Sequence, residues 1–289
     1  MRKKHPSLLK SFSMWFLFFI LLLTFLSPQS KMFAQPVLHK GNQVLESWRF
    51  RDDPQWSGKN VIVTYPPGFL NQAKLVAQEM DRVLTDFEKA YGFDPSQPVP
   101  IFLFPDRSSL QDHFFWDEDQ SATGVYFSGA IYLLNPQVWS EEFPSAEVDP
   151  TRWAHLFHKQ GPLYHETAHF YLDRYTGGNY PSWYTEAFAQ WVEYRKLGYE
   201  WIIPENDLSR HPLYEYQELS DQFHQLPNQA LAYRQSFLWL RWMVENHGDS
   251  CLHHLHQQLA RGIPFDSAWK QVFESSPRES FEEWRRQTY

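Results

Sequence analysis

The sequence predicts an α+β fold with a β-containing N-terminal lobe and an α-helical C-terminal lobe. Runs rich in β-branched and aromatic residues stand before Pro150, whereas segments with apolar residues at helical spacing follow it. Strands first and helices second are typical of the α+β class. We therefore expect one domain at 59–289, with a front lobe at 59–150 and a helical lobe at 151–289.

Local periodicity and turn-forming residues place the individual elements. The strand-like runs are VIVTY (61–65), PVPIFLFPD (98–106) and GVYFSGAIYLLNP (124–136), the last forming one or two strands joined at Ser128-Gly129. The front lobe also has helical spacing at 69–91 and a short helical segment, RSSLQDHFF. Helices of the second lobe are expected at 151–159, 162–175, 182–197, 230–247, 251–260 and 265–273.

The first 58 residues are expected to lie outside the folded domain. Four basic residues, Arg2, Lys3, Lys4 and Lys10, precede the apolar run 14–26, a pattern typical of export. The run is shorter than the roughly 20 residues of a membrane-crossing helix, which favours a cleaved signal over an anchor. We take 1–34 as a signal peptide or as a membrane anchor acting through 12–27, and 35–58 as a linker. Both alternatives place the protein outside the cytoplasm, secreted or membrane-anchored.

Composition and charge exclude several classes of protein. Hydrophobic residues make up 43% of the chain and aromatic residues 18%, which excludes a disordered chain, and we assign most of the 13 Trp to core packing. The net charge is -8, and residues 1–34 contribute five basic residues and no acid, so the remainder carries -13. Nucleic acid is therefore not an expected partner. Cys251 is the only cysteine, so no intrachain disulfide can form.

The segment PLYHETAHFYL (162–172) contains the pattern H-E-x-x-H, formed by His165, Glu166 and His169. Residues four apart on a helix share a face, so both imidazoles can bind one ion. Glu166 can then accept a proton from a water bound to that ion. A structural zinc site is a weaker alternative, because such sites usually have four ligands rich in Cys and no Cys is nearby.

A third ligand is expected from PSWYTEAFAQWVEY (181–194), where sixteen residues separate Glu186 from His169. Glu186 is otherwise an acid near a helix N-terminus that the helix dipole stabilises. Its neighbours, among them Phe188 and Trp191, are apolar, and a carboxylate on such a face usually requires a cation or a metal. Two imidazoles and one carboxylate with an open position match catalytic Zn2+.

The stretches HETAH and WYTEAFAQWVE, with sixteen residues between His169 and Glu186, resemble the gluzincin metallopeptidases, most of all the bacterial peptidase MA-like proteins and the catalytic domain of the large zinc aminopeptidases. The similarity covers roughly residues 120–289. It implies a thermolysin-like zincin fold, zinc bound by His165, His169 and Glu186, and hydrolysis of peptide or protein substrates. It also places Tyr233, in LAYRQSFLWLRWM, where the family has a tyrosine that stabilises the oxyanion.

Some residues depart from the family pattern. Ala187 replaces the usual Gly after the metal-binding Glu, Thr185 stands where the aminopeptidases often carry Asn, and the spacing is sixteen where theirs is eighteen. GAIYLLN (129–135) resembles their substrate-binding edge strand but lacks the acid that captures a free α-amino group. We therefore do not expect aminopeptidase action, although the strand at 130–134 is expected to pair with extended substrate.

Three alternative interpretations remain open at this point: one for the role of Tyr233, one for a histidine cluster and one for the function of the whole protein. Tyr233 is either the oxyanion donor or an amphipathic core residue beside Phe237. We expect His253, His254 and His256 to lie on a solvated helix face rather than to form a second metal site. The alternative to a peptidase is a catalytically silent protein of the same fold that binds peptides or the cell envelope.

Overall fold

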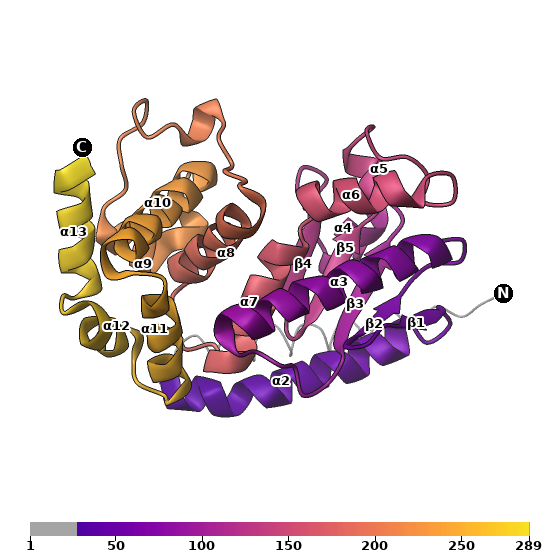
Figure 1. Cartoon of the computed structure of the whole chain (residues 1–289), viewed down its shortest axis with the longest axis horizontal. Coiled ribbons are helices and arrows are strands. Elements are labelled where there is room, and N and C mark those ends of the chain that lie inside the picture. The colour runs from indigo at the N-terminus through magenta and orange to yellow at the C-terminus, as the bar shows by residue number, and fades with distance from the viewer. Residues whose placement is uncertain (1–27, 289) are drawn as a thin grey trace.

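The molecule has one part in which helices surround a sheet and another part that consists of helices alone (Figure 1). The computed structural model describes residues 28–288. Its strands are β1 (Gln55–Ser57), β2 (Val61–Thr64), β3 (Val99–Phe104), β4 (Gly124–Phe127) and β5 (Ala130–Leu134). Its main helices are α2 (Pro28–Arg49), α3 (Leu70–Tyr91), α4 (Arg107–Phe114), α5 (Pro136–Trp139), α6 (Pro150–Gln160), α7 (Leu163–Thr176), α8 (Ser182–Leu197), α9 (Tyr216–Gln222), α10 (Gln229–His247), α11 (Ser250–Ala260), α12 (Phe265–Phe273) and α13 (Pro277–Thr288). The predicted α+β class is confirmed.

The five strands occur in the order β1-β2-β3-β5-β4, with parallel pairs in the centre and antiparallel pairs at both edges. Successive side chains of a strand point to opposite faces. In β3, Ile101 and Leu103 therefore join the main core with α3 and α7. Phe102, between them, points to a smaller apolar cluster that includes Leu110 of α4. The sheet is thus covered on both faces.

The edge strand next to α7 is β4. Ser128 (φ 46°) and Gly129 (φ 84°) form the expected two-residue connection between β4 and β5. β5 pairs with β3 on one side and with β4 on the other. The expectation that the strand at 130–134 is the edge that holds substrate is therefore wrong, because that strand is interior and β4 forms the edge.

Aromatic side chains fill the core of the helical part. Trp183 of α8, Trp239 of α10 and Trp269 of α12 are fully buried and contact one another, and the ring centroids of Trp183 and Trp239 are 4.2 Å apart. Large buried rings contribute much of the apolar area of a core. This cluster packs α8 against α10. These three Trp side chains thus have the core role that we expected for most Trp residues.

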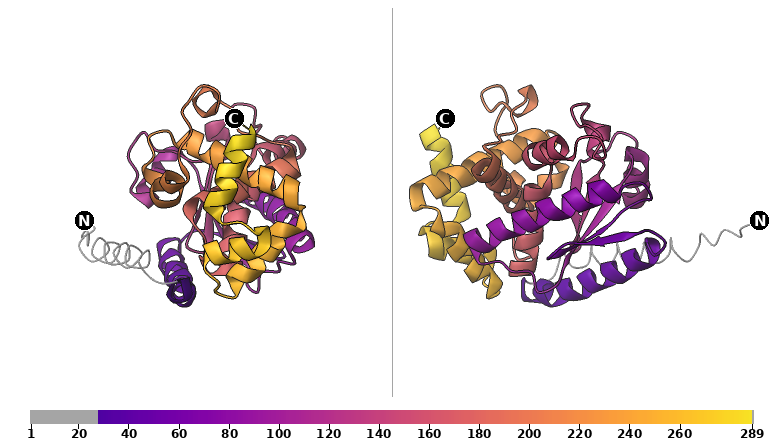
Figure 2. Two further views of the ribbon diagram at one scale, coloured as in Figure 1. Left: turned by 90° about the vertical axis from the view of Figure 1, so that its left-hand side faces the viewer. Right: turned by 45° about the vertical axis from the view of Figure 1, so that its right-hand side comes forward.

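The segment 35–58, expected as an irregular linker, instead forms most of α2 and the strand β1. α2 lies along the outside of the molecule (Figure 2). Its buried face carries His39, Asn42 and Glu46, so an apolar helical pattern is missing from the sequence. Pro36 inside the helix also argues against it locally. The proposed domain boundaries remain a prediction.

His256 does not lie on a solvated face, which corrects the expectation for the histidine cluster. It is fully buried on α11, between the hydroxyls of Tyr171 (2.9 Å) and Tyr184 (2.7 Å). Burial lowers the pKa of His256 to about 3. His254 is exposed, as expected. His256 is therefore a neutral core residue that ties α11 to α7 and α8.

The expected export signal or anchor, with its apolar run at 14–26 and the segment 12–27, lies outside the described residues. Within 28–288, no helix combines the length and the apolar character that crossing a membrane requires. Export, cleavage and location remain predictions.

Candidate metal centre

Two consecutive helices bring the three candidate metal ligands together. His165 and His169 lie one turn apart on α7, and Glu186 lies near the start of α8, which packs against α7. The Oε2 atom of Glu186 is 3.4 Å from Nε2 of His165 and 3.5 Å from Nε2 of His169. One donor atom from each residue lies within 4.8 Å of the other two. The structure thus assembles all three residues predicted as ligands.

The second nitrogen of each imidazole has its own partner. Nδ1 of His165 lies 3.0 Å from a carboxylate oxygen of Glu193, and Nδ1 of His169 lies 2.7 Å from the hydroxyl of Thr185. Such contacts fix ring orientation and leave the Nε2 atoms for a metal. A tetrahedral zinc site with ligands at about 2.0–2.1 Å has edges of roughly 3.3–3.4 Å. The separations to Glu186 match these edges, so the donor set fits zinc.

The charges of the centre favour a bound cation. Burial would lower the pKa of His165, but the carboxylates of Glu193 and Glu186 outweigh it and raise this pKa well above its usual range. Burial would raise the pKa of Glu186, but His169 and His165 outweigh it and hold that pKa far below its usual range. A buried carboxylate held ionised in this way requires a positive partner.

Glu166 lies beside the three ligands as the sequence predicts. Its side chain is buried. It lines a cavity of about 340 Å³ that the three candidate ligands also line. Burial raises the pKa of its carboxyl group, which makes the carboxylate a better proton acceptor. The carboxylate accepts a hydrogen bond from the backbone N–H of Tyr126 in β4. Glu166 is therefore held between α7 and the edge strand.

Tyr233 reaches the same cavity from α10. Its ring packs against Phe223, with centroids 5.4 Å apart, while its hydroxyl hydrogen-bonds the carboxylate of Glu186. Burial raises the pKa of this hydroxyl far above its usual value, so the group stays protonated. The ring thus has a packing role, and the hydroxyl is available as a donor at the metal centre.

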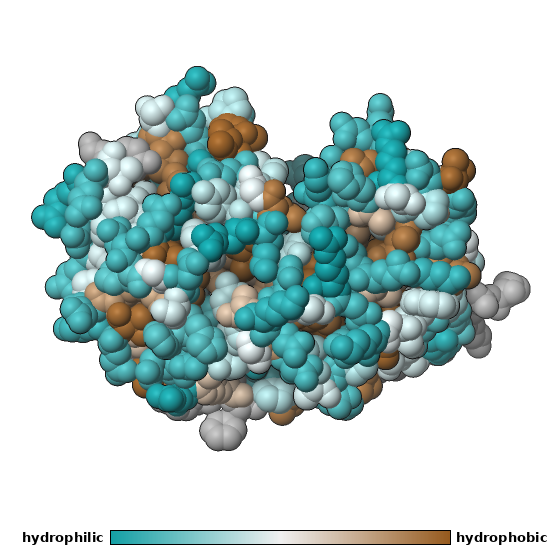
Figure 3. Space-filling model, viewed as in Figure 1, coloured by the Kyte–Doolittle hydropathy of each residue, from teal (hydrophilic) through white to brown (hydrophobic). Residues whose placement is uncertain are grey.

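A second cavity, of about 520 Å³, adjoins the first, and both are lined by Gly124, His165 and Glu166. It extends towards Trp139, and the surface is hollowed between the β-containing and helical parts (Figure 3). A Cβ atom at Gly124 would lie 2.6 Å from Pro162, so only glycine fits where β4 meets the start of α7. Together the cavities form a cleft along the edge of β4.

A family profile supplies the decisive comparison. The profile of the peptidase MA superfamily matches residues 79–288, which include α7, α8 and α10. The chain belongs to the peptidase MA superfamily. The family expected from HETAH and WYTEAFAQWVE is thereby confirmed, and peptidases of this superfamily are typically metal-dependent. No curated protein matches the sequence.

Sequence reasoning missed several residues that surround the centre of this peptidase-superfamily protein. Glu193 follows Glu186 by seven residues, two helical turns, and that spacing was the signal for a partner on the same face of α8. Tyr126 and Tyr180 also line the cavity. They come from β4 and from the segment before α8, and no local pattern in the sequence connects them to the metal helix.

Proposed function

We propose that this protein is a zinc-dependent peptidase of the gluzincin type, with a thermolysin-like arrangement of a β-containing lobe and a helical lobe. The observation that carries the proposal is the convergence of His165, His169 and Glu186, each imidazole held by a partner behind it. Glu166 stands beside them at an open cleft. A site that served structure alone would not need an acid in that position or access for a substrate.

The residues around the centre divide the work of peptide-bond hydrolysis. His165, His169 and Glu186 would hold a zinc ion, which would supply Lewis-acid activation of the attacking water. The Glu166 carboxylate accepts the proton of the attacking water and passes it to the leaving amine nitrogen. The Tyr233 hydroxyl donates a hydrogen bond to the oxyanion of the tetrahedral intermediate.

The edge of β4 is proposed to hold the substrate backbone. Hydrogen-bonded and non-hydrogen-bonded pairs alternate along an antiparallel ladder. The N–H of Tyr126 points away from β5 and donates to Glu166, so the outward backbone groups of β4 are those of Tyr126 and Gly124. Because that N–H is bonded to Glu166, the groups proposed to bind the substrate are the carbonyl of Tyr126 and the N–H and carbonyl of Gly124. Both residues line the cavity. An extended peptide that adds to this edge runs directly past the metal ligands.

The location and attachment of the peptidase are inferred from the sequence. Basic residues followed by the apolar run 14–26 support action outside the cytoplasm on peptide or protein substrates. The same run supports membrane attachment through 12–27 where it is not removed. The N-terminal residue and mass of the protein recovered from its native cell distinguish the cleaved from the anchored form.

Elemental analysis combined with a peptide-library cleavage assay tests the function. We expect one zinc ion per chain, lost in His165→Ala, and cleavage that stops on chelation and returns with added zinc. A chain that neither retains nor binds zinc contradicts the proposal. A chain that binds zinc but cleaves no peptide in a broad library is instead the catalytically silent alternative.

A further inference from the structure

One buried carboxylate joins three elements behind the metal centre. Asp173 lies on α7, four residues after His169, and is 3% exposed. Its Oδ1 accepts a hydrogen bond from Gln35 Nε2 (2.8 Å), and its Oδ2 accepts one from His39 Nε2 (2.7 Å). Both donors come from α2. A third donor is the hydroxyl of Tyr126 in β4.

Tyr126 connects this carboxylate to the proposed catalytic groups. Its ring stacks on the imidazole of His169, with centroids 6.4 Å apart and planes inclined by 27°. Its backbone N–H donates to the carboxylate of Glu166, and its hydroxyl accepts the N–H of Gly129 (3.1 Å). Tyr126 therefore contacts the proposed metal ligand His169 and the proposed proton acceptor Glu166, and it forms part of the strand proposed to hold the substrate.

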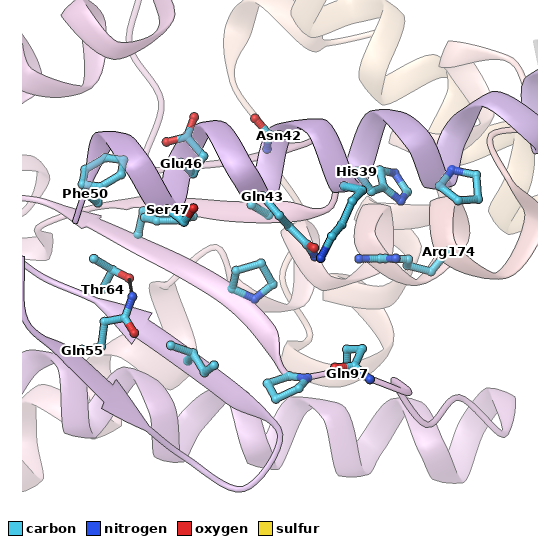
Figure 4. A pocket seen from close by; sticks show the side chains of 17 residues that line it. His39, Asn42, Gln43, Glu46, Ser47, Phe50, Gln55, Thr64, Gln97 and Arg174 are labelled. Atoms are coloured by element: carbon cyan, nitrogen blue, oxygen red, sulfur yellow. Dashed lines mark hydrogen bonds between the residues drawn. The ribbon is translucent and has the colours of Figure 1, made fainter.

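The contact between α2 and α7 includes the two hydrogen bonds from Gln35 and His39 to Asp173. A cavity of about 460 Å³ lies between α2 and the sheet, with His39 and Arg174 at one end and Phe50 at the other (Figure 4). A buried carboxylate is costly unless donors surround it, so the removal of one donor disturbs the whole cluster. The loss of His39 would leave Oδ2 of Asp173 with the Tyr126 hydroxyl alone.

We propose that His39, Gln35 and Asp173 form a positioning cluster that holds Tyr126, and through it Glu166 and β4, in the geometry required for hydrolysis. The inference rests on the proposed peptidase function and extends the catalytic unit to α2, which lies outside the matched residues 79–288. None of the three residues touches the reacting atoms. The Nδ1 atoms of the two ligand imidazoles contact Glu193 and Thr185, which do not belong to this cluster. Zinc binding should therefore not depend on the cluster.

Asn42 provides a matched control on the same helix. Like His39 it is buried, at 1% against 3% exposed. Its amide donates to the Tyr132 hydroxyl (3.1 Å) and to the carbonyls of Ser128 (3.3 Å) and Phe127 (3.4 Å) in the β4-β5 hairpin, and none of these bonds involves Asp173. Asn42→Ala therefore removes hydrogen bonds between α2 and the hairpin but none of the three hydrogen bonds to Asp173.

The test uses the full chain loaded with zinc. In His39→Ala we expect kcat to fall about tenfold, with KM and zinc content nearly unchanged, since outer partners of a metal site usually contribute tenfold or more. His39→Gln retains a donor and should recover most of the loss, whereas Asn42→Ala should keep wild-type kcat. Tyr126→Phe should match His39→Ala. The double variant that combines His39→Ala with Tyr126→Phe should also show a kcat about tenfold lower than that of the wild type. Two independent effects would instead multiply to roughly hundredfold.

A second measurement keeps the inference separate from the proposed function. Hydrogen exchange of the Tyr126 amide in the zinc-free protein should accelerate in His39→Ala and not in Asn42→Ala, whatever the chain catalyses. Equal losses of kcat in the two alanine variants, or multiplying losses in the double variant, would overturn the positioning cluster. A wild-type chain without cleavage refutes the peptidase proposal instead, and unchanged Tyr126 exchange in His39→Ala then refutes the cluster as well.

Discussion

The metal helix α7 is held by two neighbours in different ways. α8 packs on it through apolar groups: Phe188 of α8 is fully buried, and its ring centroid lies 5.9 Å from that of Tyr171 on α7. α2 contacts it through the polar side chains of His39, which is buried, and of Gln35, which is half-buried, and leaves a cavity beside the sheet. The metal ligands come from the well-packed pair, and the proposed positioning groups come from the polar contact.

The two kinds of attachment differ in strength and in direction. Burial of one large apolar side chain contributes about 1.5–3 kcal/mol, whereas a net hydrogen bond contributes about 0.5–1.5 kcal/mol. The hydrophobic effect is non-directional, whereas hydrogen bonds prefer defined distances and angles. α2 also leaves Val37 and Val44 more than half exposed. We therefore expect changes on α7 and α8 to abolish function, and changes on α2 to tune it.

The largest effect is expected on the α7 side, in Glu166→Gln. The amide keeps the shape of the side chain but cannot accept the proton, so cleavage should fall about 10³-fold or more. Zinc content should stay at the wild-type level because His165, His169 and Glu186 are unchanged. Turnover numbers and metal analysis of the same preparation provide the measurement. Near wild-type cleavage would show that another group accepts the proton.

A smaller loss is expected from Tyr233→Phe, which separates the two roles of this side chain. The ring that packs on Phe223 remains, while the hydroxyl that bonds Glu186 is lost. If the hydroxyl stabilises the oxyanion, kcat should fall roughly 10²-fold with little change in melting temperature. Unchanged kcat with an altered melting temperature would assign Tyr233 to packing alone.

The same contrast explains which parts the sequence revealed. Apolar periodicity predicted α8 with the bounds that the structure shows, 182–197, and predicted α7 to within a residue. The H-E-x-x-H spacing then located His165, Glu166 and His169. Residues four apart on a helix must share a face, so this part of the site follows from helix geometry alone.

Long-range polar contacts left no comparable pattern. Asp173 and His39 are 134 positions apart, and neither carries a local signal that identifies its partner. α2 was missed because polar residues make up much of its buried face, and β5 was taken for the edge strand because strand order is not written in a single strand. Tertiary contact, rather than propensity, decides these features.

The last prediction concerns α2 alone and affects stability rather than catalysis: the free energy of unfolding should depend on the ionisation of Glu46. This side chain is 2% exposed, its Oε1 accepts Arg49 Nη1 at 3.2 Å, and its Oε2 has no hydrogen-bond partner among the described residues. Burial raises the pKa of Glu46 from 4.5 to about 7, although Arg49 opposes the rise, and burial lowers the pKa of the neighbouring His113 to about 3.

The sign of the effect follows from the order of the two pKa values of Glu46. Below pH 4.5 both the folded and the unfolded chain bind the proton. Between pH 4.5 and 7 only the folded chain keeps it, so the free energy of unfolding should decrease by about 1.4 kcal/mol per pH unit, reaching about 3 kcal/mol above pH 7. Glu46→Gln keeps the shape of the side chain and an acceptor for Arg49, and it should remove this part of the pH dependence.

Urea unfolding of both proteins at pH 5 and pH 8 measures the difference in the free energy of unfolding. The distant metal centre should retain its zinc in both proteins. If the free energies of unfolding of the two proteins fall in parallel as the pH rises, Glu46 is not the group that causes the pH dependence. The polar contacts of α2 would then cost less stability at high pH than its buried carboxyl group suggests.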